Sequence, residues 1–278
     1  MPELPLGAVI AFDFESWDIQ DEIALLKSAG VRRVQVYRNY AQGITAAHIR
    51  ETLDAAGLAI DSLHGYFHLQ GFAGPAFDLS SPDAAAREAA LGIMRSEAEF
   101  ARALGCRDII VHPVDPDATS EDGREEGLLA GARVLASIGA RADCRFLIEN
   151  MPPPMFGRDA ALLRRVVDAV ASPHVGCAFD SGHATLTGDP VAAVRTMGAR
   201  LWGVHLHDTL GKEDDHMIPG TGVVPFEDVA RALAEIGFGG TFLLEVYRPT
   251  AEVRRDMTPA RLKFIDRLRR IASGQRIA

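Results

Sequence analysis

The stretch 145–183 reads RFLIENMPPPMFGRDAALLRRVVDAVASPHVGCAFDSGH and contains the pattern that decides the fold. It contains two short apolar runs, 145–149 and 175–180, and each run ends in an acidic residue: Glu149 in the first and Asp180 in the second. Between them, residues 159–171 place apolar side chains at the spacing of an amphipathic helix. Continuous apolar runs of this length are typical of parallel strands that are covered on both faces. The stretch therefore predicts a strand–helix–strand unit of an α/β protein.

The same alternation continues along the whole chain. Strands are expected at 8–14, 31–37, 59–64, 108–112, 145–149, 175–180, 201–205 and 241–246. Helices are expected at 19–29, 46–56, 81–104, 125–138, 159–171, 191–197, 226–236 and 259–271. Eight such units, with no linker long enough to divide domains, predict a single (β/α)8 TIM barrel over residues 1–278. A doubly wound open sheet is the alternative, but the chain has no Gly-rich phosphate-binding fingerprint.

The composition is that of a globular, acidic protein. The chain has 29 Lys and Arg against 38 Asp and Glu, a formal net charge of −9 over 278 residues, which does not favour a nucleic-acid partner. No apolar run reaches the roughly 18–20 residues of a membrane span, and the N-terminal residues lack a basic leader. The three cysteines show no disulfide spacing. We expect a cytoplasmic protein without a membrane partner.

Polar residues stand at the ends of six consecutive expected strands, in otherwise apolar runs. They are His64, His112, Glu149, Asp180, His205 and Glu245. The C-terminal ends of barrel strands meet at one mouth, where the active sites of this fold lie. Three carboxylates and three imidazoles in one partly dry space would repel each other or remain unpaired. A divalent cation resolves that conflict, so the pattern predicts a metal site. A hydrogen-bonded loop residue is the alternative at any single position.

A second group of ligand types follows the strands expected at 175–180 and 201–205. His183 comes three residues after Asp180, and Asp214 and His216 lie in the loop 207–225. Together they would supply three ligands to a further ion; a solvated, hydrogen-bonded loop is the alternative. Other polar residues near the expected mouth are candidates for substrate contact, with a satisfied loop residue or solvated surface residue as the alternative: His68, His207, Arg248, Arg38 and Tyr40.

These motifs resemble those of the xylose isomerase-like barrel superfamily, which includes sugar isomerases and epimerases, inosose dehydratases and endonuclease IV. The segments that carry the resemblance are LHGYFH (63–68), IIVHP (109–113), FLIEN (146–150), FDSGHA (179–184), VHLHD (204–208), DDHMIPGTG (214–222) and LLEVY (243–247). In sugar epimerases of this group the matching strand-end residues bind one divalent metal, which implies this role for Glu149, Asp180, His205 and Glu245. The resemblance also implies that His183 contacts substrate.

The resemblance to endonuclease IV extends to its three-zinc site. The remaining ligands of that site match His64, His112, His183, Asp214 and His216, so all nine ligand types are present. The chain departs from the nuclease elsewhere, with IENMPP and FDSGHA in place of LENTAG and LDTCHA. Its loop after the strand expected at 59–64 reads HGYFHLQ, where the nuclease carries a DNA-inserting HxPYLIN.

The resemblance implies a metal-dependent isomerase or epimerase of carbohydrate metabolism, acting on a small sugar or sugar phosphate through an enediolate. One to three Zn²⁺ or Mn²⁺ ions would be the cofactor, with Glu149 and Glu245 exchanging the proton and His183 orienting a hydroxyl. Three alternatives stay open: a zinc phosphodiesterase acting on abasic DNA, an inosose dehydratase-like lyase, and a non-catalytic carbohydrate-binding protein. A homo-oligomer is also open, because barrels often pair through their outer helices.

Overall fold

The computed structural model of the chain describes residues 2–12, 18–40, 43–67, 74–114, 120–247 and 250–275. The strands are β1 Leu6–Phe12, β2 Arg33–Arg38, β3 Ala59–His64, β4 Asp108–Val111, β5 Arg145–Glu149, β6 Val175–Asp180, β7 Leu201–His205 and β8 Phe242–Leu244. The helices are α1 Ile19–Ser28, α2 Ala46–Ala56, α3 Ala84–Leu104, α4 Arg124–Ala142, α5 Ala160–Val170, α6 Ser181–Thr187, α7 Pro190–Met197, α8 Phe226–Glu235, α9 Thr250–Asp256 and α10 Pro259–Ala272.

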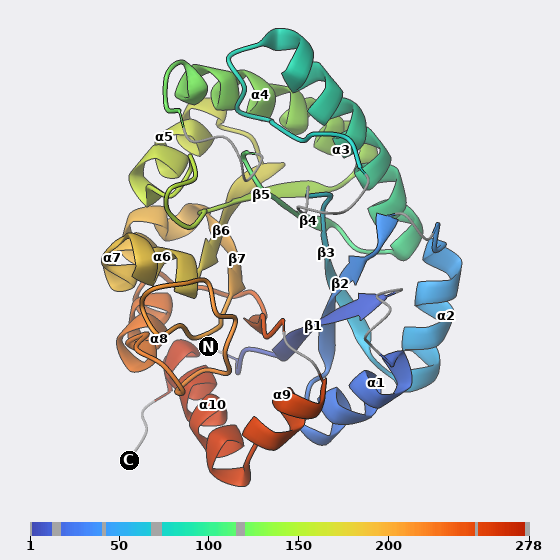
Figure 1. The fold of residues 1–278 in the computed structure, drawn as a ribbon, viewed down its shortest axis with the longest axis vertical. Helices are drawn as coiled ribbons and strands as arrows, with labels where there is room; N and C mark the ends of the chain where they lie inside the picture. The colour runs from blue at the N-terminus through green and yellow to red at the C-terminus, as the bar shows by residue number, and fades with distance from the viewer. Residues whose placement is uncertain are drawn as a thin grey trace.

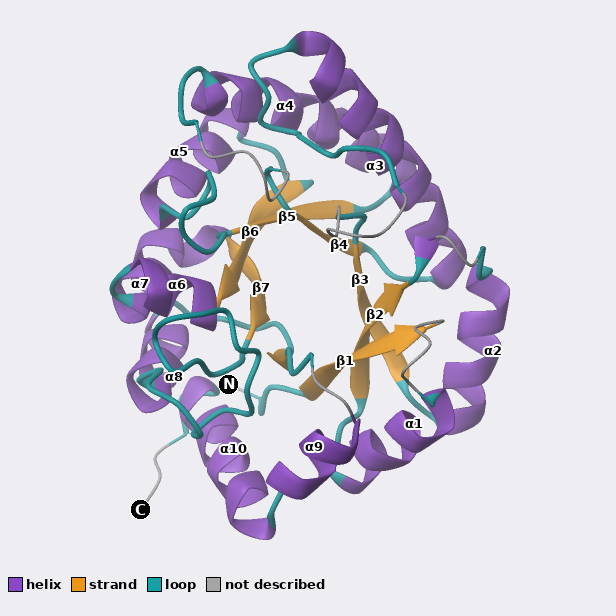
Figure 2. Cartoon of the chain, viewed as in Figure 1, coloured by secondary structure: helices purple, strands orange, loops and turns teal. Residues whose placement is uncertain are grey.

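The strands form a barrel with the helices on its outside (Figures 1 and 2). All strand pairs are parallel, in the order β7-β6-β5-β4-β3-β2-β1-β8. The barrel closes between β7 and β8, where Leu206 N donates to Leu243 O (2.9 Å) and Glu245 N donates to Leu206 O (3.1 Å). The predicted (β/α)8 barrel is confirmed. Among the helices that the structure describes, none has the length and apolar character needed to cross a membrane.

Two helices were not predicted from the sequence, and one begins later than expected. The α6 and α9 helices have seven residues each, too few to show a 3.6-residue period. The α6 helix starts directly after β6, where the Asp180 side chain caps it by accepting from His183 N at 2.7 Å. The α3 helix begins at Ala84, not at residue 81, because its cap is Asp83, whose carboxylate accepts from Ala85 N at 2.9 Å.

Apolar side chains alternate along the strands between the inside and the outside of the barrel. In β2, for example, Val34 and Val36 belong to the main core between strands and helices, whereas Tyr37 packs with Val9 and Leu243 in a smaller cluster. This period of two places every second residue of a strand inside the barrel. The interior thus receives polar residues from strands that otherwise look uniformly apolar.

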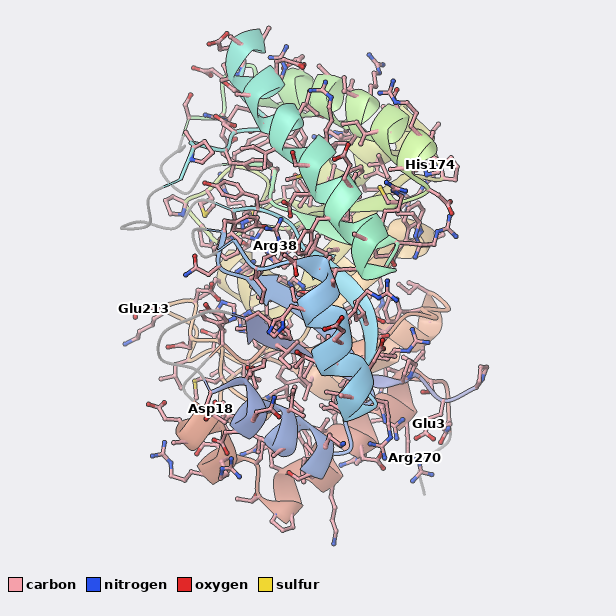
Figure 3. The ribbon with its side chains drawn as sticks, turned by 90° about the vertical axis from the view of Figure 1, so that its right-hand side faces the viewer. Glu3, Asp18, Arg38, His174, Glu213 and Arg270 are labelled. Atoms are coloured by element: carbon pink, nitrogen blue, oxygen red, sulfur yellow. The ribbon has the colours of Figure 1, made fainter. Side chains whose placement is uncertain are left out.

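Figure 3 shows the two ends of the barrel from the side. Asp18 and Glu213, which follow β1 and β7 in the chain, lie at one end, and Glu3, His174 and Arg270 lie at the other. At the N-terminal end of the strands, a polar cavity of about 280 Å³ contains the ion pairs of Arg33 with Asp61 and of Arg145 with Asp108. The cavity with the predicted site residues lies at the opposite, C-terminal end.

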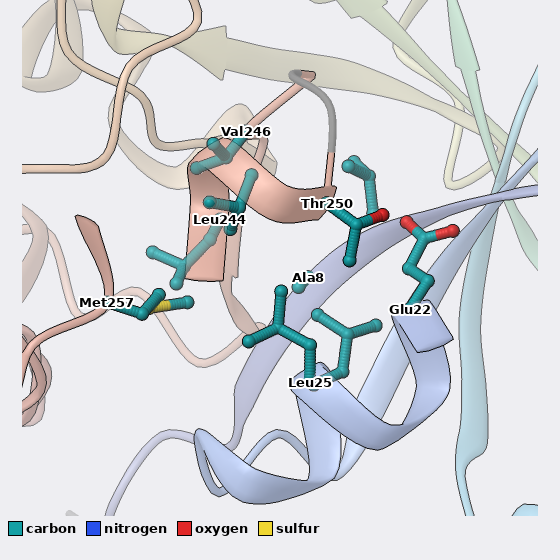
Figure 4. Close-up of a pocket in the computed structure, with 10 residues that line it drawn as sticks. Ala8, Glu22, Leu25, Leu244, Val246, Thr250 and Met257 are labelled. Carbon is teal, nitrogen blue, oxygen red and sulfur yellow. The ribbon is translucent and has the colours of Figure 1, made fainter. Parts of the chain in front are cut away.

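A buried glutamate lines an apolar space outside the barrel wall, between β1, α1 and α9 (Figure 4). The Glu22 side chain is 6% exposed and, among the residues that the structure describes, accepts one hydrogen bond, from Ala11 N at 3.4 Å. The space beside it measures about 30 Å³, enough for one water molecule. Burial raises the pKa of Glu22 to about 8, although the bond from Ala11 opposes the shift.

This raised pKa predicts that Glu22→Gln stabilises the protein at neutral pH. Below pH 4.5 the carboxyl is protonated in both states and does not affect stability. Between pH 4.5 and about 8 the unfolded chain releases the proton and the folded chain keeps it, so each pH unit lowers the free energy of unfolding by about 1.4 kcal/mol. Denaturant unfolding at pH 4.5 and pH 7.5 checks this: the variant should gain stability over the wild type only at the higher pH. An equal difference at both values would contradict it.

Candidate metal centre and active site

A cavity of about 220 Å³ opens at the C-terminal end of the barrel. Its polar lining consists of residues that the sequence analysis singled out: His64, His112, Glu149, His183, Asp214, His216 and Glu245. Its remaining lining is aromatic or apolar: Tyr37, Phe67, Met151, Pro152, Met155 and Tyr247. The cavity therefore combines a set of possible metal ligands with a wall that can exclude water.

Four buried side chains form the centre of the site, and we call them the quartet: Glu149, Asp180, His205 and Glu245. They come from the ends of β5, β6 and β7 and from the residue after β8, and one ligand atom of each lies within 4.8 Å of the others. His205 Nδ1 is 2.8 Å from Glu149 Oε1 and 3.3 Å from Glu245 Oε2. Residues at least 25 positions apart in the sequence are thus brought to one point by the order of the strands.

A first flanking group consists of His64 and His112, which share Glu149 with the quartet. His112 Nε2 lies 3.3 Å and His64 Nε2 lies 3.8 Å from Glu149 Oε2. The two rings meet edge to face, with centroids 5.0 Å apart. Glu149, at the end of β5, therefore lies close to three imidazoles from the ends of β3, β4 and β7: His64, His112 and His205.

A second flanking group lies on the other side, where the loop after β7 returns over α6. It consists of His183, His207, Asp214 and His216. Asp214 Oδ2 is 3.1 Å from His183 Nε2 and 3.0 Å from His216 Nε2. His207 Nε2 hydrogen-bonds to Asp180 Oδ1 at 3.0 Å, which joins this group to the quartet.

The charges of these groups depend strongly on one another. Burial opposes the ionisation of Glu149, but the imidazoles of His205 and His112 outweigh it and hold the pKa of this carboxyl well below its usual range. Glu245 differs, because burial dominates and raises its pKa. Burial disfavours the charged form of His205, yet Glu149 and Glu245 raise its pKa to about 9. Without another cation, the site depends on charged imidazoles to balance its carboxylates.

The donor set fits a divalent cation. Three buried oxygens of the quartet, Glu149 Oε2, Asp180 Oδ2 and Glu245 Oε2, accept no well-aligned hydrogen bond within the described part of the chain. An imidazole nitrogen lies 2.9–3.3 Å from each of them, on His112, His207 and His205 respectively. A buried carboxylate oxygen without a well-aligned bond is costly, and one on each of three neighbouring carboxylates is a set that a metal ion satisfies. Carboxylate oxygen with one imidazole nitrogen suits Zn²⁺ or Mn²⁺.

The expected substrate contacts are placed differently from the candidate ligands. His68 and Arg248 lie outside the described residues. His207 is fully buried and does not line the cavity, because its ring stacks on His216 with centroids 4.1 Å apart. Arg38 and Tyr40 were also candidates, but both bind Glu97 of α3, so they tie β2 to that helix.

Sequence reasoning missed the contributions of strand β2 and of the apolar wall. Gln35 and Tyr37 contact quartet residues, and Met151 and Met155 follow Glu149 in the loop that lines the cavity. The period of two in β2 was the available signal for Gln35 and Tyr37, because it puts both on the same face. The methionines carried no such signal.

The sequence between residues 23 and 268 matches the family described as xylose isomerase-like TIM barrel. The chain belongs to this family. The superfamily inferred from the strand-end motifs is thereby confirmed. Membership accounts for the barrel and for the position of the cavity at its C-terminal end.

Individual relatives show how far the similarity extends. An uncharacterised protein of Methanocaldococcus jannaschii is 34% identical over 103 residues, 35% of each chain. An L-ribulose-5-phosphate 3-epimerase of Escherichia coli is 27% identical over 180 residues, 63% of this chain and 62% of that protein. A solved xylose isomerase domain protein from Planctomyces limnophilus superposes with a TM-score of 0.78 at 23% identity, over 98% of this chain and 100% of that one. The chain spans 35–60% of the first three curated relatives.

Proposed function

We propose that this protein is a metal-dependent isomerase or epimerase of a small sugar or sugar phosphate. The observation that carries the proposal is the set of three quartet carboxylate oxygens that accept no well-aligned hydrogen bond from the described residues, at the edge of a cavity large enough for a small ligand. The similarity to an epimerase of L-ribulose 5-phosphate supports it. The cytoplasmic location and a homo-oligomer stay predictions.

Glu149, Asp180, His205 and Glu245 would hold the ion. A bound Zn²⁺ or Mn²⁺ supplies Lewis-acid polarisation of a substrate carbonyl. Glu149 and Glu245 both line the cavity and both lie against His205 Nδ1. We assign to these two carboxylates the removal and the return of a proton at the carbon next to the carbonyl.

The surroundings of His183 support a role in orienting the substrate. Its Nδ1 lies 2.8 Å from Asn150 O, which fixes the ring, and its Nε2 lies 3.1 Å from Asp214 Oδ2 while the ring lines the cavity. A substrate hydroxyl would therefore take the place of Asp214 at Nε2. We assign to His183 the orientation of a substrate hydroxyl. The wall of Tyr37, Phe67 and Tyr247 would exclude water from the reacting carbon.

Proton exchange into the sugar tests this function. Protein reconstituted with Mn²⁺ or Zn²⁺ is incubated in D₂O with a panel of ketoses and ketose phosphates and followed by NMR. We expect deuterium at the carbon next to the carbonyl, together with a new epimer or isomer. If no sugar in the panel shows either change with metal-loaded protein, the proposal is refuted.

A second candidate is a zinc phosphodiesterase that acts on abasic DNA, as in endonuclease IV. One observation favours it: the two flanking groups adjoin the quartet, so all nine residues that match the nuclease ligands lie in one connected cluster. Three tightly bound zinc ions and nicking of an abasic duplex would support it, whereas one bound ion with sugar turnover would support the isomerase. An inosose dehydratase-like lyase would use the same quartet and stays a prediction.

A further inference from the structure

Strand β2 supplies no ligand to the quartet, yet it touches two of the four ligands. Its inward residues Gln35 and Tyr37 are both buried, at 1% and 5% exposure. Gln35 Oε1 lies 2.9 Å from His205 Nε2, and the Tyr37 hydroxyl donates a short hydrogen bond to Glu245 Oε1. The two ligands that β2 contacts are His205, the last residue of β7, and Glu245, the residue after β8.

The direction of the hydrogen bonds at Gln35 is fixed from the N-terminal end of the barrel. Asp61 is held by Arg33 and by the Thr241 hydroxyl, and it accepts from Ser62 Oγ at 3.3 Å. Because Ser62 has one hydroxyl proton and gives it to Asp61, its oxygen accepts from Gln35 Nε2, at 2.9 Å. The amide oxygen of Gln35 must then face His205.

An amide oxygen only accepts, so the imidazole nitrogen that faces it carries a proton in both the neutral and the charged ring. In His205 this nitrogen is Nε2, and the nitrogen that faces Glu149 and Glu245 is Nδ1. The bond that one ring nitrogen makes determines which nitrogen is available to a metal. At Glu245, the bond from Tyr37 occupies Oε1, whereas Oε2 accepts no well-aligned hydrogen bond from the described residues and lies 3.3 Å from His205 Nδ1.

We propose that β2 is the positioning strand of the metal centre. Gln35 presents Nδ1 of His205 as the ligand atom, and Tyr37 holds Glu245 so that Oε2 faces the ion. The inference rests on the quartet of the proposed function. Gln35 and Tyr37 are positioning residues, because each acts through a metal ligand.

Zinc affinity, measured by competition with a chelating dye, tests the proposal without requiring turnover. We expect Gln35→Leu to weaken zinc binding by about 10–100-fold, the cost of losing an outer-shell partner of a metal ligand. Gln35→Glu keeps an acceptor against Nε2 and should restore most of that affinity. Tyr37→Phe keeps the ring stacked on His64 but removes the donor, and should weaken binding by about tenfold.

Val36→Ala is the matched control, because Val36 is buried in the same strand on its opposite face. The Val36→Ala variant should have a lower melting temperature and a zinc affinity within about twofold of the wild type. In a separate measurement, ¹⁵N NMR of the zinc-loaded wild type should show His205 coordinated through Nδ1. Unchanged affinity in Gln35→Leu, equal losses in Gln35→Leu and Gln35→Glu, or coordination through Nε2 would overturn the proposal. Zinc binding that responds as expected in a protein that turns over no sugar would overturn the proposed function alone.

Discussion

Replacing Glu149 by glutamine is expected to abolish measurable turnover and to remove most of the metal affinity. Glu149 belongs to both the quartet and the group of His64 and His112, so one substitution affects two sets of contacts. The amide keeps the shape of the side chain but loses the negative charge and replaces one acceptor oxygen with a donor. Loss of a general base alone lowers kcat by about 10²–10⁴-fold. Initial rates and metal content of the reconstituted variant measure both effects.

Glu22→Gln is the matched control, since it makes the same chemical change at a buried glutamate outside the site. It should leave metal content and kcat unchanged. Glu245→Gln should resemble Glu149→Gln in turnover, because the two carboxylates have complementary roles. A double variant of Glu149 and Glu245 that keeps full activity would rule out their assignment as proton carriers.

The second large effect is expected at Asp208, a buried residue directly after His207. Its carboxylate accepts four backbone hydrogen bonds from residues of the loop between β7 and α8. These bonds hold the loop in its folded conformation. Oδ1 accepts from Thr209 N and Val224 N, both at 3.0 Å, and Oδ2 accepts from Gly220 N and Gly222 N, both at 2.8 Å. That loop carries Asp214 and His216.

Asp208→Asn turns one of these oxygens into an NH₂ group that faces two backbone donors. We expect a loss of about 2–5 kcal/mol in the free energy of unfolding, because two N–H groups that are buried or partly buried lose their acceptor. Asp215→Asn, in the same loop, is the comparison: its carboxylate accepts from Thr209 Oγ1 and Leu210 N at a less buried position, so the loss should be about 1 kcal/mol. Equal stability of Asp208→Asn and wild type in denaturant unfolding would contradict this account of the loop.

The sequence was sufficient to predict the elements that obey a simple period. Strands 59–64, 145–149, 175–180 and 201–205 have the predicted bounds, because each is a short, mainly apolar segment that ends in a His, Asp or Glu residue. The same rule located the quartet, since barrel strands bring their C-terminal ends together. The prediction was less accurate for β8. A strand was expected at 241–246, but the observed strand ends at Leu244 and Glu245 lies beyond it.

Features that depend on contacts across the barrel were not predictable in the same way. His207 was expected to meet substrate because it follows the strand, but the chain stays extended through the bridge of Leu206 with Leu244. This brings His207 to Asp180 and buries it. Gln35 likewise looks like a single polar interruption of a strand until its partners, Ser62 and His205, are known. Side-chain hydrogen bonds between distant strands leave little trace in a single sequence.

Metal uptake by the purified protein tests the central claim most directly. The protein is stripped with a chelator, titrated with Zn²⁺ and Mn²⁺, and analysed for bound metal after removal of free ions. We predict saturable uptake of at least one equivalent by the wild type and by Glu22→Gln, and its loss in Glu149→Gln. A correctly folded wild-type protein that binds neither ion saturably would contradict the assignment of the quartet as a metal centre, together with the chemistry proposed for it.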